Sequence, residues 1–440
     1  MPGRCGPRVA RGSGGVTAAR LRQGWADLRA AFWLRPAVMT ASAILLAQAL
    51  VRLEGAVTLP AGLDDLVYGG AAAGARDVLG VLASATIGVA GTTFSITVAA
   101  LTLASNQMGP RLLRNFTSDA GNQYALGALV ATFAFSLVAL RSVHEGDGGG
   151  FVPQLAVSVG LLMGFGCIGV LIWFLHHVAA SISVDRVVAL VAAELDQALD
   201  KACGDGAGPG AAPGPAPDAA PLRAPGSGYL RVLDDASLAD WAAGCGAVLH
   251  LDVRAGGFVL PGSVVGRVSP PGIREEAQAA LAEAMVLGQA RSVEQDLEYA
   301  VRQLVEIALR ALSPGINDPF TAIGVLDRLG ATLAGLAGRH LPDGVFPRDG
   351  TVRLVRPATD YAGLADAMFH MLRQAASGQP AVMIRMLEVL AAVAAVEPDS
   401  GRRAVLARHA DLAAAAALRG TRDASARRAI RDRLASVIRD

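Results

Sequence analysis

Two uncharged hydrophobic segments constrain this chain more than any other feature of its sequence. Residues 78–104 form a run of 27 without a charged side chain, and residues 152–175 form a run of 24. A helix needs about 20 mostly apolar residues to cross the roughly 30 Å hydrocarbon core of a bilayer. Both segments are therefore predicted to be transmembrane helices.

Two shorter segments complete a predicted membrane domain over residues 36–180. Residues 124–140 are uncharged and end at Arg141, whose side chain can reach the lipid headgroups. Residues 36–51 lie between Arg35 and Arg52. A cleaved signal peptide is the alternative for this segment, but the Arg-rich region before it is longer than a signal peptide requires. We expect four helices, at about 36–53, 78–104, 124–141 and 152–175.

Arginine residues set the predicted orientation of these helices. Residues 1–36 contain seven Arg, and the loop between the second and third helices contains Arg111 and Arg114. The other two loops are acidic. Because basic loops stay in the cytoplasm, both termini are predicted to be cytoplasmic and the protein to lie in the cell's cytoplasmic membrane.

The remaining sequence predicts several cytoplasmic segments. The predicted fold class is mainly α, with a four-helix transmembrane bundle followed by an α+β domain in which a small β unit precedes a helical region. A single long helix is expected over residues 277–312, ending before Pro314. The predicted segments are an Arg-rich tail over 1–35, an amphipathic exit helix over 181–202, a flexible Gly/Pro/Ala linker over 203–228, the β unit over 229–270 and the helical domain over 271–440.

Composition gives little support for catalysis or nucleic-acid binding. The net charge is +1, and the arginines are too scattered to form a basic surface. Lys201 is the only lysine and lies outside any phosphate-binding or kinase motif. The histidines show no His-x-x-x-His or Glu-x-x-His spacing. We therefore expect no enzyme, no catalytic residue, no cofactor, no metal site and no nucleic-acid partner.

Small residues recur at helical spacing in two predicted membrane helices. Such residues let helix backbones approach closely in lipid. They either pack the helices of one chain together or form a subunit interface or pore lining. The second helix contains Ser84, Gly88, Gly91 and Ser95, and the fourth contains Gly160 and Gly164.

Five polar residues are candidates for a functional site. Arg111 and Arg114 are three residues apart, and we expect them to touch lipid headgroups, to form an anion or lipid site, or to contact the soluble domain. Asn317 and Asp318 lie in a Ser-Pro-Gly-Ile-Asn-Asp-Pro segment, in which Asp318 is expected to cap the next helix. An interfacial enzyme site is the alternative, and it requires these four residues to meet each other and Asp119.

Several of these motifs together resemble a known family. They are Pro-Arg-Leu-Leu-Arg-Asn-Phe at 110–116, Asn-Gln at 122–123, the glycine turn at 257–262 and the segment 296–319. The combination resembles a bacterial family of predicted integral membrane proteins catalogued as domain of unknown function 2254. The resemblance implies four membrane helices and a cytoplasmic domain, and it implies no reaction, ligand or soluble partner.

Two functions are compatible with these features. The small and hydroxylated faces of the second and fourth helices favour an oligomeric channel or permeation protein, with the lipid bilayer and further copies of the chain as partners. The alternative is a membrane-anchored sensory or regulatory scaffold whose cytoplasmic domain binds a partner or small ligand.

Overall fold

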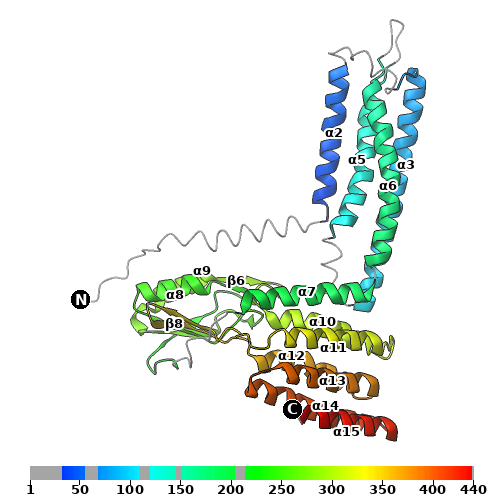
Figure 1. Ribbon diagram of the computed structural model, residues 1–440. Coiled ribbons are helices and arrows are strands. Elements are labelled where there is room, and N and C mark those ends of the chain that lie inside the picture. Colours follow the sequence, from blue (N-terminus) through cyan, green and yellow to red (C-terminus); the bar gives the residue numbers. More distant parts are fainter. Residues whose placement is uncertain are drawn as a thin grey trace. The chain divides into compact units, whose positions relative to one another are not determined.

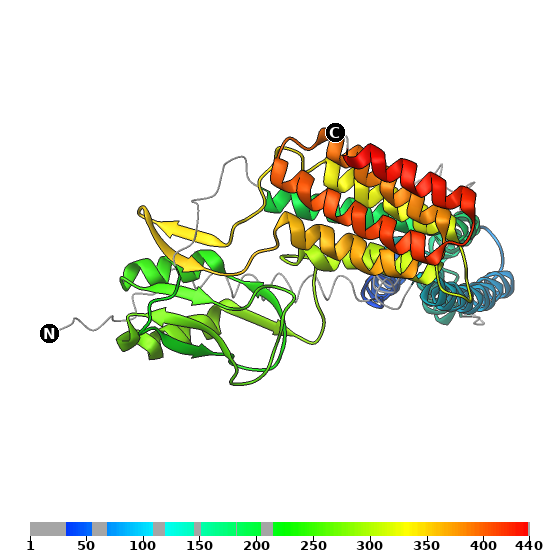
Figure 2. The same cartoon turned by 90° about the horizontal axis from the view of Figure 1, so that it is seen from below.

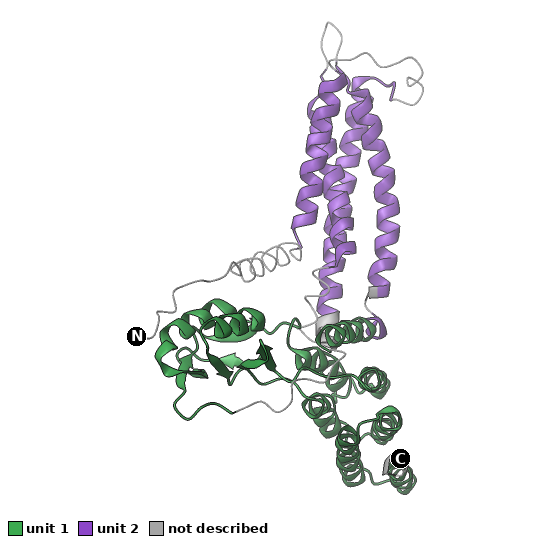
Figure 3. Cartoon of the chain, turned by 60° about the vertical axis from the view of Figure 1, so that its left-hand side comes forward, with its two compact units in different colours: residues 1–22, 187–440 green, residues 23–186 purple. Residues whose placement is uncertain are grey.

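The computed structural model describes residues 32–54, 68–108, 119–144, 151–181, 183–203 and 214–438. The chain divides into two compact units (Figure 3). The described part of Gln23–Arg186 forms the membrane unit, and the described part of Val187–Asp440 forms the C-terminal unit. The mainly helical fold class is confirmed. Apart from an isolated bridge between His144 and Phe151, the strands within these described ranges all lie in the C-terminal unit.

Four helices among the described residues are long and apolar enough to cross a membrane (Figure 1). One of them, α3, begins at Ala72 rather than at 78, so its first turns include the charged residues Arg76 and Asp77. Charged side chains near a helix end can extend to the headgroup region, which explains why the helix is longer than its uncharged run. The four helices are α2 (Leu34–Glu54), α3 (Ala72–Met108), α5 (Ala120–Arg141) and α6 (Gln154–Ser181).

Helix α5 is the most buried of the four and packs against the other three. Gly127 permits its close approach to α2, because a Cβ at this position would lie 3.2 Å from the Cα of Pro36. Phe135 of α5 and Leu79 of α3 are fully buried in the same core. Packing of this kind holds helices together in lipid, where the hydrophobic effect does not.

All but the first three residues of α7 (Val184–Ala202) belong to the C-terminal unit, and the buried face of this helix includes Val191 and Leu195. Two small sheets follow, with strand orders β1-β5-β3-β8-β7 and β4-β2-β6 (Figure 2). Leucine and valine residues of both sheets share a core with helices α8 (Asp235–Gly244) and α9 (Arg274–Ala284). The strands are β1 (Ala220–Arg223), β2 (Gly228–Leu233), β3 (Val248–Leu251), β4 (Phe258–Val259), β5 (Val264–Ser269), β6 (Met285–Gly288), β7 (Val345–Arg348) and β8 (Thr351–Val355).

The rest of the C-terminal unit is a stack of helices beside the sheets (Figure 2). Helices α10 and α11 pack on α12 and α13, which in turn pack on α14 and α15. Thr332 of α11 also donates a hydrogen bond to Asp196 of α7, at 2.8 Å, so α7 belongs to this stack. The stacked helices are α10 (Leu297–Ala311), α11 (Pro319–Ala334), α12 (Tyr361–Ala375), α13 (Pro380–Val396), α14 (Ser400–Gly420) and α15 (Ala424–Ile438).

The prediction of one long helix over 277–312 is wrong. The segment contains the end of α9, strand β6 and most of α10. Residues 280–287 include many good helix formers, but β6 pairs antiparallel with β2, with Leu287 opposite Leu230. Tertiary pairing therefore overrides local helix propensity here.

The predicted boundaries of the linker and the β unit also need correction. Residues 220–223 lie in β1, which pairs with β5, and β2 begins at Gly228, so the predicted linker over 203–228 includes ordered sheet. Residues 204–213 of that linker, and residues 1–31 of the predicted tail, lie outside the described residues. The β unit extends beyond 270, because β8 pairs parallel with β3.

Candidate functional site

The small residues of the membrane helices fall into two structural groups. Gly160 and Gly164 of α6 pack inside the bundle, since a Cβ at Gly160 would lie 3.4 Å from Leu79 and one at Gly164 would lie 2.5 Å from Leu82. These two glycines therefore serve packing within one chain, the first of the two predicted roles. The other group lies on α3 and has a different environment.

Ser84, Gly88, Gly91 and Ser95 form what we call the α3 small-residue face. All four are exposed in the single chain. A Cβ added at Gly88 or Gly91 would meet no atom within 4 Å. At about 100° per residue these positions share one side of the helix. The opposite side of α3 is buried and includes Ala83, Thr86, Ala90, Thr93 and Thr97.

Asp119 has a clear structural role at the start of α5. Its Oδ1 atom accepts a hydrogen bond from the backbone N–H of Gly121 at 2.6 Å, which caps the helix. Its Oδ2 atom lies 2.9 Å from Nε2 of His177 on α6, and Trp173 stacks on that imidazole with ring centroids 4.9 Å apart. Asp119 thus joins α5 to α6. Arg111 and Arg114 lie outside the described residues, so a site that includes them stays a prediction.

Asn317 and Asp318 form the corner between α10 and α11. Asp318 accepts hydrogen bonds from the backbone N–H groups of Phe320 and Thr321, both at 3.1 Å, and from the Thr321 hydroxyl at 2.6 Å. The Thr321 hydroxyl is the main cause of a lowered pKa of Asp318. Asn317 has φ 50°, and its Oδ1 atom accepts a hydrogen bond from Gln379 at 3.0 Å. These contacts are those of a capped helix corner.

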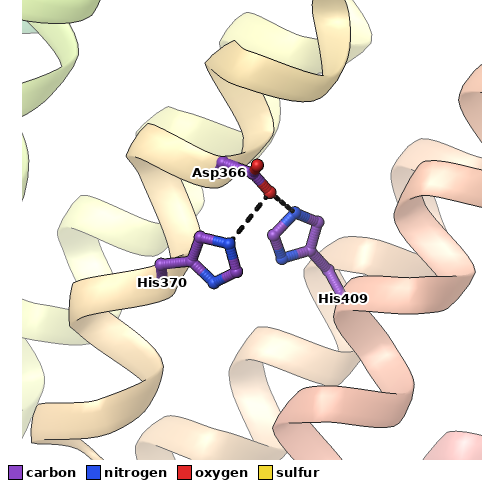
Figure 4. Close-up of side chains that lie close together, drawn as sticks. All are labelled: Asp366, His370 and His409. Atoms are coloured by element: carbon purple, nitrogen blue, oxygen red, sulfur yellow. Dashed lines mark ion pairs between the residues drawn. The ribbon is translucent and has the colours of Figure 1, made fainter.

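A cluster of Asp366, His370 and His409 is absent from the sequence predictions (Figure 4). Asp366 and His370 are one turn apart on α12, and His409 lies on α14. Oδ1 of Asp366 is 3.0 Å from Nε2 of each histidine. The one local signal was Asp-x-x-x-His at 366–370, because residues at i and i+4 share a helix face. The third residue joins only through packing of α12 against α14.

Arg408 belongs to the same cluster. Its Nη2 atom lies 2.6 Å from Oδ1 of Asp366 and 3.4 Å from Nε2 of His409. Burial would raise the pKa of Asp366, but Arg408 and the two histidines outweigh it and lower that pKa. Burial, followed by the charge of Arg408, lowers the pKa of His409 to about 4. His409 is therefore a neutral imidazole at pH 7.

A cavity of about 340 Å³ lies between the two sheets. Its polar lining is already engaged: Asp234 caps α8 by accepting from the N–H of Ser237, and Gln295 bonds the backbone of Leu233 in both directions. Arg348 pairs with Asp240. These groups hold the sheets and α8 together, and the cavity offers no convergent set of free polar atoms.

Helices of membrane-spanning length followed by a separate sheet-and-helix unit define a multi-pass membrane protein with a large C-terminal domain. More particularly, the chain belongs to the family of predicted membrane proteins catalogued as DUF2254, whose model matches residues 29–392. The family predicted from the motifs is thus confirmed. Uncharacterized proteins of Mycobacterium tuberculosis (strain H37Rv) and Mycobacterium bovis are each 35% identical over 377 residues, which is 83% of this chain and 72% of the relative. No solved structure gives a significant match.

Proposed function

We propose that the protein is a homo-oligomeric permeation protein whose subunits associate through the α3 small-residue face. The observation that carries this proposal is the open environment of Gly88 and Gly91 on the side of α3 facing away from the bundle. Glycine exposed to lipid gains little packing, whereas against another helix it permits close backbone contact. A second chain is the natural partner for such a face.

Hydroxyl groups on the exposed side of α3 favour a polar path beside this contact. Ser95 donates to the carbonyl of Gly91 and Thr102 to that of Val98, each at 2.9 Å. These bonds satisfy the hydroxyl hydrogens inside the helix, while the oxygens keep lone pairs that can solvate a passing ion or polar solute. A ring of such helices would form a pore whose lining carries hydroxyl groups and no charged residues.

The first test is the mass of the full-length chain in native nanodiscs. We expect a defined oligomer, and we expect Gly88→Leu and Gly91→Leu each to weaken association about tenfold or more, since one lost close contact of about 1.4 kcal/mol has that effect. Gly166→Leu on α6 is the matched control, because Gly166 is also exposed with open space around it. Liposomes containing the wild-type chain should show flux of small ions, and the two α3 variants should not.

A strictly monomeric wild-type chain, or variants that associate like the Gly166→Leu control, would remove this proposal. A monomer without flux would support the alternative, a membrane-anchored regulatory protein. That alternative is favoured by the C-terminal unit's own hydrophobic core of sheets and helices.

We also infer that both termini lie in the cytoplasm, on the basis of seven Arg in residues 1–36. Ser142, directly after α5, would then face outward, whereas Cys203, after α7, would face inward. A membrane-impermeant maleimide should label a Ser142→Cys variant in intact cells. The unsubstituted chain should become labelled at Cys203 only after permeabilisation. The reverse pattern would show the opposite orientation.

A further inference from the structure

We propose that Asp366, His370 and His409 form a binding site for a divalent transition-metal ion of the zinc class, between α12 and α14 of the C-terminal unit. The inference is independent of the proposed permeation role, because it concerns a different part of the chain. It adds a ligand where the sequence predicted none.

The donor set matches the chemistry of zinc. Two imidazoles and one carboxylate are the protein ligands of a common type of zinc site that leaves a fourth position open. The three donor atoms all lie within 4.8 Å of one another. Donors about 2.0–2.2 Å from a tetrahedral ion lie about 3.3–3.6 Å apart. Oδ1 of Asp366 is already 3.0 Å from each imidazole nitrogen, so the main adjustment is that the two imidazole nitrogens approach each other by about 1 Å. Imidazole donors also select this class over magnesium or calcium.

The ligand His409 is held in place before any ion binds. The side chain of His409 has no exposed surface, and the ring of Phe369 packs beside it with centroids 5.6 Å apart. Its Nδ1 atom is buried without a hydrogen-bond partner among the described residues.

The cluster is also accessible from solvent. Asp366 and His370 are 38% and 36% exposed, so an ion can enter from the surface of α12 and meet the buried His409. The open fourth position would then face solvent and hold water. Such an ion would link α12 to α14, two helices of neighbouring layers in the stack.

Arg408 is the one group that opposes an ion at this site. Its guanidinium occupies Oδ1 of Asp366 at 2.6 Å, and it must leave that oxygen or move to Oδ2 when a cation binds. The side chain is 48% exposed, so it is free to swing toward solvent. Arg408 therefore lowers the affinity of the site, and this gives the proposal a prediction that a purely structural ion pair does not make.

The test is calorimetric titration of the EDTA-treated full-length chain in detergent, without a histidine tag, using Zn²⁺ and then Co²⁺. We expect one high-affinity equivalent per chain, with Co²⁺ giving visible absorption of an imidazole-ligated ion. His370→Ala should weaken binding at least tenfold, and its partly exposed position leaves the core intact. His340→Ala is the matched control, because His340 is an exposed histidine outside the cluster, and it should bind like wild type.

Arg408→Gln supplies a second measurement that does not depend on the stability of a histidine variant. It should bind Zn²⁺ severalfold more tightly than wild type, because the competing cation is gone. Absence of a high-affinity equivalent in the wild-type chain would overturn the proposal. Equal binding by wild-type and His370→Ala chains would overturn it as well, and so would weaker binding by Arg408→Gln.

Discussion

Replacing Asp296 by Ala should lower the thermal unfolding midpoint of the C-terminal unit by about 10 °C or more. The side chain of Asp296 is only 4% exposed, and its Oδ2 atom lies 2.6 Å from the Arg291 guanidinium. Burial raises the pKa of Asp296 although Arg291 acts to lower it. Desolvation therefore outweighs the attraction, and the main effect of the substitution is that the Arg291 guanidinium, which is 16% exposed, loses its carboxylate partner. Breaking such a pair costs about 3–5 kcal/mol.

Asp296 has a second role that adds to this loss. Its Oδ1 atom accepts a hydrogen bond from the N–H of Tyr299 at 3.1 Å and so caps α10. Loss of an N-cap costs about 1 kcal/mol. A unit of this size shifts its midpoint by about 2–4 °C for each kcal/mol, which gives the expected 10 °C or more.

Thermal unfolding of the purified full-length chain, followed by circular dichroism, measures this effect. Asp252→Ala is the control, because Asp252 and Arg267 form an exposed pair with a separation of 3.7 Å and should contribute almost nothing. Adding Arg291→Leu to Asp296→Ala should recover part of the loss by removing the stranded charge. Equal midpoints for Asp296→Ala and Asp252→Ala would contradict the argument.

The membrane helices could be predicted from the sequence because a bilayer imposes a length and composition that local inspection detects. The ends of the helices were harder to predict from the sequence, as the start of α3 at Ala72 shows. The C-terminal unit was harder, because its sheets depend on distant segments. Strand β8 pairs with β3, with Leu354 opposite Leu249, and nothing in either short strand indicates the other.

The candidate residues illustrate the same limit at the level of single side chains. The cap at Asp318 follows from its place before Pro319, and the structure confirms it. The α3 small-residue face could be detected by its spacing, but only packing separates it from Gly160 and Gly164. The Asp366, His370 and His409 cluster was missed because one of its members comes from a helix in another layer of the stack.

Arg402→Ala should destabilise the helical stack by about 3–5 kcal/mol, because it leaves a buried carboxylate without its countercharge. Glu397 has no exposed side-chain surface, and Nη1 of Arg402 lies 3.6 Å from its Oε2 atom. Arg402 also stacks on the ring of Tyr361 at 4.9 Å. It donates to the carbonyls of Leu336 and Arg339, at 3.0 and 2.7 Å. One side chain thus connects the start of α14 to α12 and to the segment after α11.

Glu397→Gln separates the charge effect from the other contacts of Arg402. On its own it should cost little, since Arg402 keeps its two carbonyl acceptors and its aromatic partner. Combined with Arg402→Ala it should restore about 1–3 kcal/mol, which is the coupling expected of residues in contact. Arg402→Lys should rescue poorly, because an ammonium lacks the planar fork that donates to two carbonyls and stacks on a ring. The unfolding midpoints of the wild type, Glu397→Gln, Arg402→Ala and the double variant measure this coupling. Strictly additive losses of stability would show that Glu397 and Arg402 contribute to stability independently of each other.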